Sequence, residues 1–118
     1  MSEKDVEAAL ESLNSIVGVT GSLVAGKEGS IISHKTPEGT DIDLASAMAS
    51  TLFGTGEKAV KDFKQGHIVQ AMVEGKKGKT LIIAGDKTVL MVMTDLKVSL
   101  GLVRLEMEKG IKIVEKAL

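Results

Sequence analysis

The chain contains no cysteine and only two aromatic side chains, and its charges almost cancel. The absence of cysteine excludes disulfides and thiolate chemistry. Phe53 and Phe63 are too few to stack successive bases of a single-stranded nucleic acid. With 15 basic and 16 acidic residues, the chain has no net field that attracts nucleic acid or an anionic membrane. We therefore expect no nucleic-acid partner.

Long hydrophobic runs are missing as well. Runs such as "VLMVM" (89–93) are far too short to span a bilayer. The N-terminal "MSEKDVEAAL" is acidic and amphipathic, unlike a signal peptide, and it lacks the Met-Gly start of a lipidated chain. We expect a cytoplasmic protein with no direct membrane anchor. Its 118 residues, 43% of them hydrophobic, predict one domain over 1–118.

Hydrophobic periodicity predicts three helices and five strands. The helices are expected over 2–18, 44–66 and 96–118. The strands are expected as a hairpin over 19–35 with its turn at 26–29, and as a meander over 67–74, 79–85 and 88–95. The first helix is marked by Val6, Leu10, Leu13 and Val17, and the last by Leu96, Leu100, Val103, Met107, Ile111, Val114 and Leu118.

The strand patterns indicate how the sheet is built. Segment 89–93 is apolar on both faces, so it is expected at the centre of a sheet covered on both sides. Segment 30–35 carries Ser33 and Lys35, which suits an edge, and 67–74 lies at the far end of the meander. The predicted fold class is an α/β/α sandwich. Its order is helix-strand-strand-helix-strand-strand-strand-helix, around a five-stranded antiparallel sheet.

The stretch "EGKKGKT" (74–80) looks like a phosphate-binding loop but fails its requirements. Such a loop needs a glycine where this chain has Val73. It also needs a following helix, whereas a strand is predicted after Thr80. We interpret the stretch as a solvated hairpin turn with glycines at positive φ, and we expect no nucleotide or other cofactor.

Other candidate sites are weak. Asp41 and Asp43 have no further ligand at metal spacing, so capping of the middle helix explains them better than a metal does. His34 and His67 lack a nucleophilic partner and are expected at the surface. We predict no catalytic residue, no metal site and no enzymatic activity.

Arg104 is the only arginine, which raises the possibility of an arginine finger. An ion pair with Glu108, four residues on along the exposed side of the last helix, is the preferred interpretation.

The middle helix has more apolar surface than one sheet needs. At about 100° per residue, its apolar positions fill an arc of roughly 180°, whereas one sheet covers a stripe of about 100°. We expect the surplus to pack on a second subunit, with deep burial in its own domain as the alternative. The arc contains Leu44, Ala45, Met48, Ala49, Leu52, Phe53, Ala59, Val60 and Phe63.

A dimer interface is predicted from this arc and from the third strand. Ala45, Ala49 and Gly56 form a small-residue flank that we assign to a partner helix, while Ala47 on the opposite side is expected to face water. The third strand has neither proline nor an inward lysine at its centre, so its edge is expected to pair in a symmetric dimer. The predicted interface comprises Ala45, Met48, Ala49, Leu52, Phe53, Gly56, Val60, His67, Val69, Ala71 and Val73.

Two stretches resemble the roadblock / dynein light chain family. They are "GVTGSLVAGKEGSII" (18–32), which opens with Gly18 to Gly21, and "LGLVRLEMEKGIKIV" (100–114), with Gly101, Arg104 and Glu106. The order of elements matches along essentially the whole chain.

The resemblance implies a profilin-like fold and a homodimer or heterodimer, in which third strands pair and middle helices lie antiparallel. It also implies no catalysis: family members act as scaffolds or regulators of small Ras-like GTPases, and some serve as dynein light chains. The leading hypothesis is a dimeric scaffold or regulator of a Ras-like GTPase, with a paralogous subunit as an option. The alternatives are a dynein-type light chain, or a profilin-like module that senses a small molecule between sheet and helices. The apolar interior positions offer little to orient such a molecule.

Overall fold

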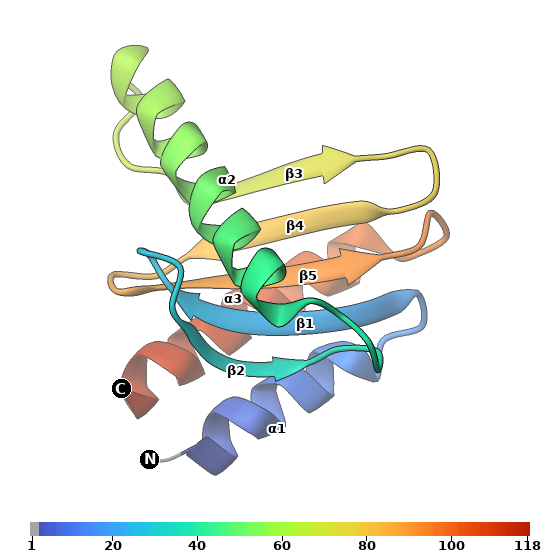
Figure 1. The fold of residues 1–118 in the computed structure, drawn as a ribbon. Helices are drawn as coiled ribbons and strands as arrows, with labels where there is room; N and C mark the ends of the chain where they lie inside the picture. The colour runs from blue at the N-terminus through green and yellow to red at the C-terminus, as the bar shows by residue number, and fades with distance from the viewer. Residues whose placement is uncertain (1–2) are drawn as a thin grey trace.

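The computed structural model describes residues 3–118 and shows a sheet between two layers of helices (Figure 1). The strand order is β2-β1-β5-β4-β3, and every neighbouring pair is antiparallel. This confirms the predicted fold class, with β5 in the centre and β2 and β3 at the edges. In chain order the elements are α1 (Glu3–Asn14), β1 (Val19–Gly26), β2 (Ile31–Lys35), α2 (Ile42–Asp62), β3 (Gln70–Glu74), β4 (Lys79–Ala84), β5 (Thr88–Thr94) and α3 (Leu100–Ala117).

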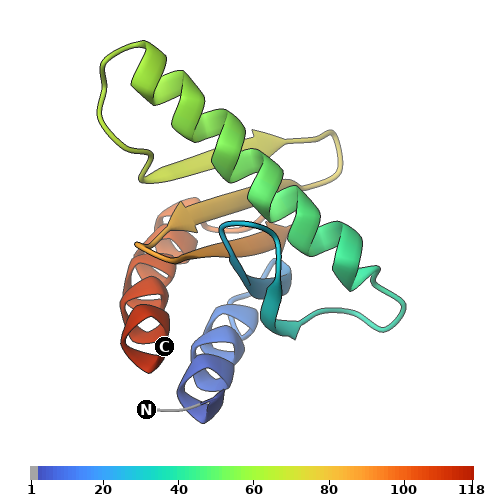
Figure 2. The same ribbon diagram turned by 60° about the vertical axis from the view of Figure 1, so that its left-hand side comes forward.

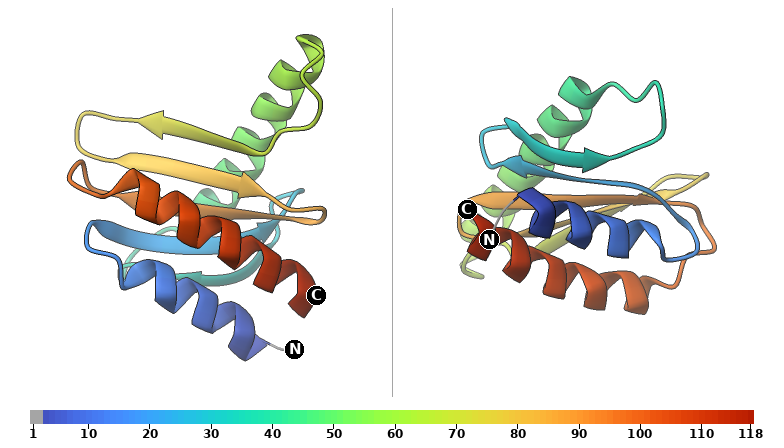
Figure 3. Two further views of the ribbon diagram at one scale, coloured as in Figure 1. Left: turned by 180° about the vertical axis from the view of Figure 1, so that it is seen from behind. Right: turned by 90° about the horizontal axis from the view of Figure 1, so that it is seen from below.

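The helices divide unequally between the two faces of the sheet. α2 crosses one face alone, here called the front face, and α1 and α3 lie side by side on the back face (Figures 1 and 3). Side chains alternate along β5 between the two sides: Val89 and Met91 belong to the front core, and Leu90 and Val92 to the back core. This alternation explains why β5 is apolar throughout.

Three predicted helix ends are wrong, and one of them is the end of α2, which lies at Asp62 instead of residue 66. α1 stops at Asn14, and Val17 is 90% exposed in the turn before Gly18, whose φ is +99°. α3 begins only after Ser99, whose side chain accepts the N–H of Leu102, so Leu96 precedes the helix and is exposed. Val17 and Leu96 thus keep the apolar spacing of the neighbouring helix without belonging to it.

The stretch 74–80 is the turn between β3 and β4, as predicted. Glu74 lies opposite Lys79, and the N–H of Gly75 donates to the carbonyl of Gly78 at 2.7 Å. The reason given for the glycines is wrong, because neither has a positive φ. At Gly78 a Cβ would lie 2.3 Å from the carbonyl oxygen of Thr94, so close approach of two backbones requires glycine there.

Candidate functional site

The position of α2 determines what the front face exposes. The helix begins after Asp41, whose carboxylate accepts the N–H of Leu44 at 3.1 Å, so the predicted cap is confirmed at this residue. From there α2 runs diagonally over the sheet, and its C-terminal end extends beyond the β3 edge (Figures 1 and 2). Among the residues that the structure describes, no strand lies beneath that end.

The small residues of α2 face its own sheet, which corrects the predicted orientation of the helix. Ala49 is fully buried in the front core. At Gly56 a Cβ would lie 2.3 Å from Cδ1 of Ile68, so this glycine admits a side chain of its own subunit. Ala45 is partly buried against the same core, and Ala47 faces water as predicted. Ala49 therefore has no exposed surface for a partner, and the side of Gly56 where a Cβ would stand is occupied by Ile68.

The surplus apolar surface lies on a different flank of α2. Leu44 is 57% exposed and Met48 is 45% exposed, while Phe63, at the overhanging end, is 74% exposed. Ala59 is exposed between them and Leu52 is half-buried. We call these five residues, Leu44, Met48, Leu52, Ala59 and Phe63, the α2 flank.

A groove of about 430 Å³ runs beside the first half of the α2 flank, between α2 and the ends of β3 and β5. Val73 of β3, which is 51% exposed, forms part of its rim. Its lining is almost entirely apolar, and the carboxylate that borders it, Asp41, is already used to cap α2. The lining consists of Thr40, Asp41, Leu44, Ala45, Met48, Leu52, Val73, Thr80, Met91 and Met93.

The outer edge of β3 carries unused backbone hydrogen-bonding groups. The carbonyl of Val69 accepts the N–H of Ala84, and the N–H of Gly75 donates to Gly78, so the odd-numbered residues bond towards β4. In an antiparallel strand the intervening residues direct their N–H and C=O groups to the other side. The outward groups belong to Gln70, Met72 and Glu74.

The opposite edge of the sheet is protected. The register of β2 against β1 shifts so that Ile32 is left unpaired, which is a bulge. The carbonyl of Lys35 accepts a hydrogen bond from the side-chain amide of Asn14 at 2.9 Å. The ammonium group of Lys35 lies 3.7 Å from the carboxylate of Glu11. These features of β2 discourage a further strand, whereas β3 has a regular register along its length.

The predicted interface residues thus separate into three groups. The sequence placed His67 and Val69 within the third strand, but both precede β3, which begins at Gln70. Leu44, Ala59 and Phe63 were left out of the predicted interface although they lie in the helical arc, which was the signal for them. Of the predicted set, Met48, His67, Val69 and Val73 are exposed; Ala45, Leu52, Phe53, Gly56, Val60 and Ala71 are half-buried; and Ala49 is buried.

The segment between α2 and β3 is fixed by Glu57. Its carboxylate accepts the backbone N–H of Ile68 at 2.9 Å and contacts Nδ1 of His67 at 3.1 Å. The Ile68 N–H, and secondarily His67, hold the pKa of Glu57 below its usual value. Nearby, Nζ of Lys27 lies 4.9 Å from the ring centroid of Phe53. These contacts serve the subunit's own structure.

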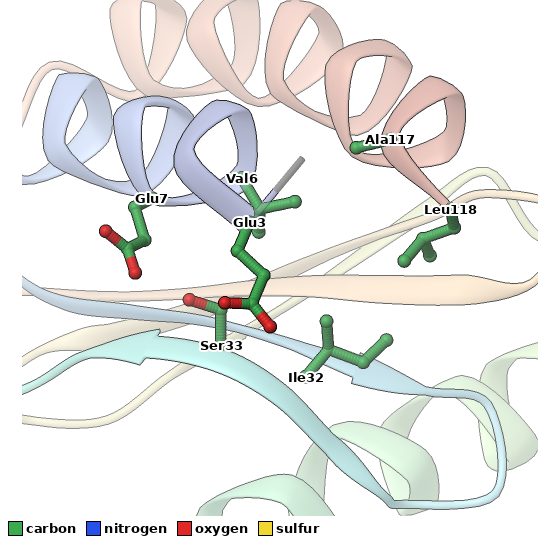
Figure 4. Close-up of a pocket in the computed structure, with 7 residues that line it drawn as sticks. All are labelled: Glu3, Val6, Glu7, Ile32, Ser33, Ala117 and Leu118. Atoms are coloured by element: carbon green, nitrogen blue, oxygen red, sulfur yellow. The ribbon is translucent and has the colours of Figure 1, made fainter. Parts of the chain in front are cut away.

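A second hollow, of about 200 Å³, lies between α1, β2 and the end of α3 (Figure 4). Its polar groups are Glu3 and Glu7, which descend from one helix, and Ser33. Within residues 3–118 no three histidine, aspartate or glutamate side chains converge to hold a metal ion. In the same range no helix is long and apolar enough to cross a membrane.

Arg104 does not form the ion pair predicted from the sequence. Its neighbour on the same helix, Glu106, contacts Lys109 at 4.0 Å, and no ion pair joins Arg104 to Glu108 in the described chain. Instead a terminal guanidinium nitrogen lies 3.9 Å from Sδ of Met72, on the back face of β3.

Comparison with known proteins agrees with this architecture. The family model described as "Roadblock/LC7 domain" matches residues 5–95. The uncharacterized protein MJ0310 of Methanocaldococcus jannaschii is 39% identical over 105 residues, which cover 89% of this chain and 92% of that protein.

Solved structures give the same result. Myxococcus xanthus MglB superposes with a TM-score of 0.89 at 21% identity, over 98% of this chain and 96% of that one. A Roadblock/LC7 domain from Streptomyces avermitilis gives 0.86 at 21% identity, over 92% and 93%. Acanthamoeba castellanii profilin II, at 12% identity, gives 0.63 over 97% and 96%, which places the fold among the profilin-like folds. With a family model that matches most of its length and relatives at this identity, the chain belongs to the Roadblock/LC7 family.

Proposed function

We propose that this chain is a homodimeric, non-catalytic regulator or scaffold of a small Ras-like GTPase. One observation carries the proposal. The overhanging apolar end of α2 and the apolar groove lie at opposite ends of the same open strand edge. The overhang is beside the start of β3, and the groove is beside its end at Val73. This arrangement is self-complementary under a two-fold axis.

The dimer follows from pairing two copies of β3 in antiparallel fashion. A two-fold axis through the strand pair brings the start of one β3 beside the end of the other. The overhang of one subunit, with Phe63, then lies over the groove of its partner, beside Met48 and Val73. The same operation satisfies the outward backbone groups of β3 and joins two sheets into one of ten strands. The two α2 helices lie antiparallel on the front face.

The GTPase assignment rests on the family resemblance together with the chemistry of the surface. The described residues hold no metal cluster, and the exposed surfaces beside β3 are apolar, so the chain's contribution is expected to be binding. The paired α2 helices provide a broad, pre-formed front face with mixed polar and apolar side chains, which suits a protein partner. A small-molecule sensor is less consistent with the groove, because its apolar lining has few free polar groups to orient a ligand.

The proposal is tested by titrating purified Ras-like GTPases of the source cell, each loaded with GDP or a non-hydrolysable GTP analogue, into the protein. We expect calorimetric binding of at least one GTPase, with a dissociation constant that differs between the two nucleotide states. Met48→Glu should remove this binding together with the dimer, and Glu108→Arg, an exposed reversal on α3 at the back of the subunit, serves as the control. Absence of binding by every GTPase in both states would overturn the assignment.

A further inference from the structure

The guanidinium of Arg104 is poorly satisfied within one subunit. The side chain is half-buried, and its Nε atom is buried with no hydrogen-bond partner in the described chain. The only hydrogen-bond contact of the side chain there is the sulfur of Met72 at 3.9 Å, and a thioether is a weak acceptor. An arginine partly withdrawn from water usually has a carboxylate or carbonyl acceptor, because an unsatisfied buried donor is costly. Because Nε is enclosed by its own subunit, the terminal guanidinium nitrogens are the donors available to an acceptor from another subunit.

Its position beside the edge strand limits what that acceptor can be. Ala71 packs into the front core, so its neighbours Gln70 and Met72 project to the back face, where Arg104 lies. Glu74, two residues further along, projects to the same side. Within residues 3–118, no helix covers the outer margin of this back face (Figure 3).

Symmetric strand pairing brings a carboxylate to this margin. If the two five-residue strands overlap fully, Met72 lies opposite the partner's Met72, and Gln70 lies opposite the partner's Glu74. The partner's Glu74 is then a diagonal neighbour of Met72, roughly 7–8 Å away between Cα atoms, a separation that long side chains bridge. An extended arginine that already rests on Met72 reaches this carboxylate.

We propose that Arg104 binds the partner's Glu74, so that two such ion pairs cross the dimer interface. The inference rests on the β3 dimer proposed above and adds the residues that select the partner. Each Glu74 also lies opposite Lys79 of its own sheet, so the carboxylate would lie between two cations. A register slip that carries Glu74 away from Arg104 loses both pairs. The pairs therefore favour a second copy of this chain over an unrelated strand.

The test uses two charge reversals, Arg104→Glu and Glu74→Arg, first separately and then mixed. Each variant alone places like charges together twice in its homodimer. The heterodimer of the two variants restores two attractive pairs, because each of the two contacts between positions 104 and 74 then joins a glutamate to an arginine. Glu108→Arg, an exposed reversal on the same helix as Arg104, is the matched control. Circular dichroism melts verify that every variant is folded.

We expect each single variant to raise the homodimer dissociation constant at least about tenfold. In native mass spectrometry the equimolar mixture should contain clearly more heterodimer than the statistical half, while Glu108→Arg mixed with wild type should stay statistical. A statistical mixture of the two reversals in a protein whose wild type is dimeric overturns the Arg104–Glu74 pair alone. A wild type that is monomeric at every concentration overturns the proposed dimer and this pair together.

Discussion

Replacement of Met48 by glutamate is predicted to separate the dimer while leaving each subunit folded. Met48 lies on the α2 flank beside the groove and is 45% exposed within one subunit. The remaining exposed surface is what the partner would cover. A glutamate at this position still reaches water in the isolated subunit, so its stability should change by no more than about 0.5 kcal/mol.

The effect on association is larger. Burying a whole methionine side chain contributes roughly 1.5–3 kcal/mol, so the exposed half contributes about 1 kcal/mol per subunit. An unpaired carboxylate in an apolar interface adds a desolvation cost of at least about 1–2 kcal/mol per subunit, even where water partly compensates it. Symmetry doubles both effects, which gives about 4 kcal/mol or more and a dissociation constant raised about 1,000-fold.

Sedimentation equilibrium over a range of concentrations measures this constant directly. The control is Ala47→Glu, one residue away on the water-facing side of the same helix, which should match the wild type. A Met48→Glu protein that dimerises as tightly as the wild type would refute the assignment of the α2 flank to the partner.

Three further predictions concern stability. Ala49→Glu should unfold the protein or lower its melting temperature severely, because the carboxylate would enter the front core; a stable, folded variant in a thermal melt would contradict the orientation of α2. Gly78→Ala should destabilise the subunit by about 1–3 kcal/mol in urea titrations, since its Cβ would contact the carbonyl of Thr94, and an unchanged midpoint would show that the hairpin can move aside. Glu57→Gln should lower stability at neutral pH but not at strongly acidic pH. The Ile68 N–H depresses the folded-state pKa of Glu57, so its contribution is present above the unfolded pKa and is lost as the pH falls through the folded one; equal destabilisation at both pH values would argue against this.

The order of elements was predictable because it depends on local patterns. The apolar residues on both faces of β5 and the polar residues of β2 identified a central and an edge strand without any knowledge of their contacts. Helix ends were less predictable: Val17 and Leu96 continue the apolar spacing, but Gly18 and the Ser99 cap separate them from the helices. The spacing of apolar residues does not show where a helix ends when the next apolar residue lies in the adjoining turn.

The candidate site was predictable only in part. The helical wheel identified an apolar arc wide enough to cover the sheet and also to contact a second subunit, but it did not show which part of the arc faces the sheet. Tertiary contacts show this: Ile68 of the following loop packs at Gly56 and Ala49 is buried on the sheet, whereas Met48 stays partly exposed. Similarly, the sequence indicated an open third strand, but only its register against β4 shows which backbone groups point outward.

The pairing of two β3 edges is tested most directly by amide hydrogen exchange measured residue by residue with NMR. In a monomer the N–H groups of Gln70, Met72 and Glu74 point to solvent, whereas those of Ala71 and Val73 bond to β4. We predict that in the concentrated wild-type protein all five amides exchange slowly. In Met48→Glu the three outward amides should become fast while Ala71 and Val73 stay protected. Fast exchange at Gln70, Met72 and Glu74 in a sample that is dimeric by sedimentation would contradict the central claim.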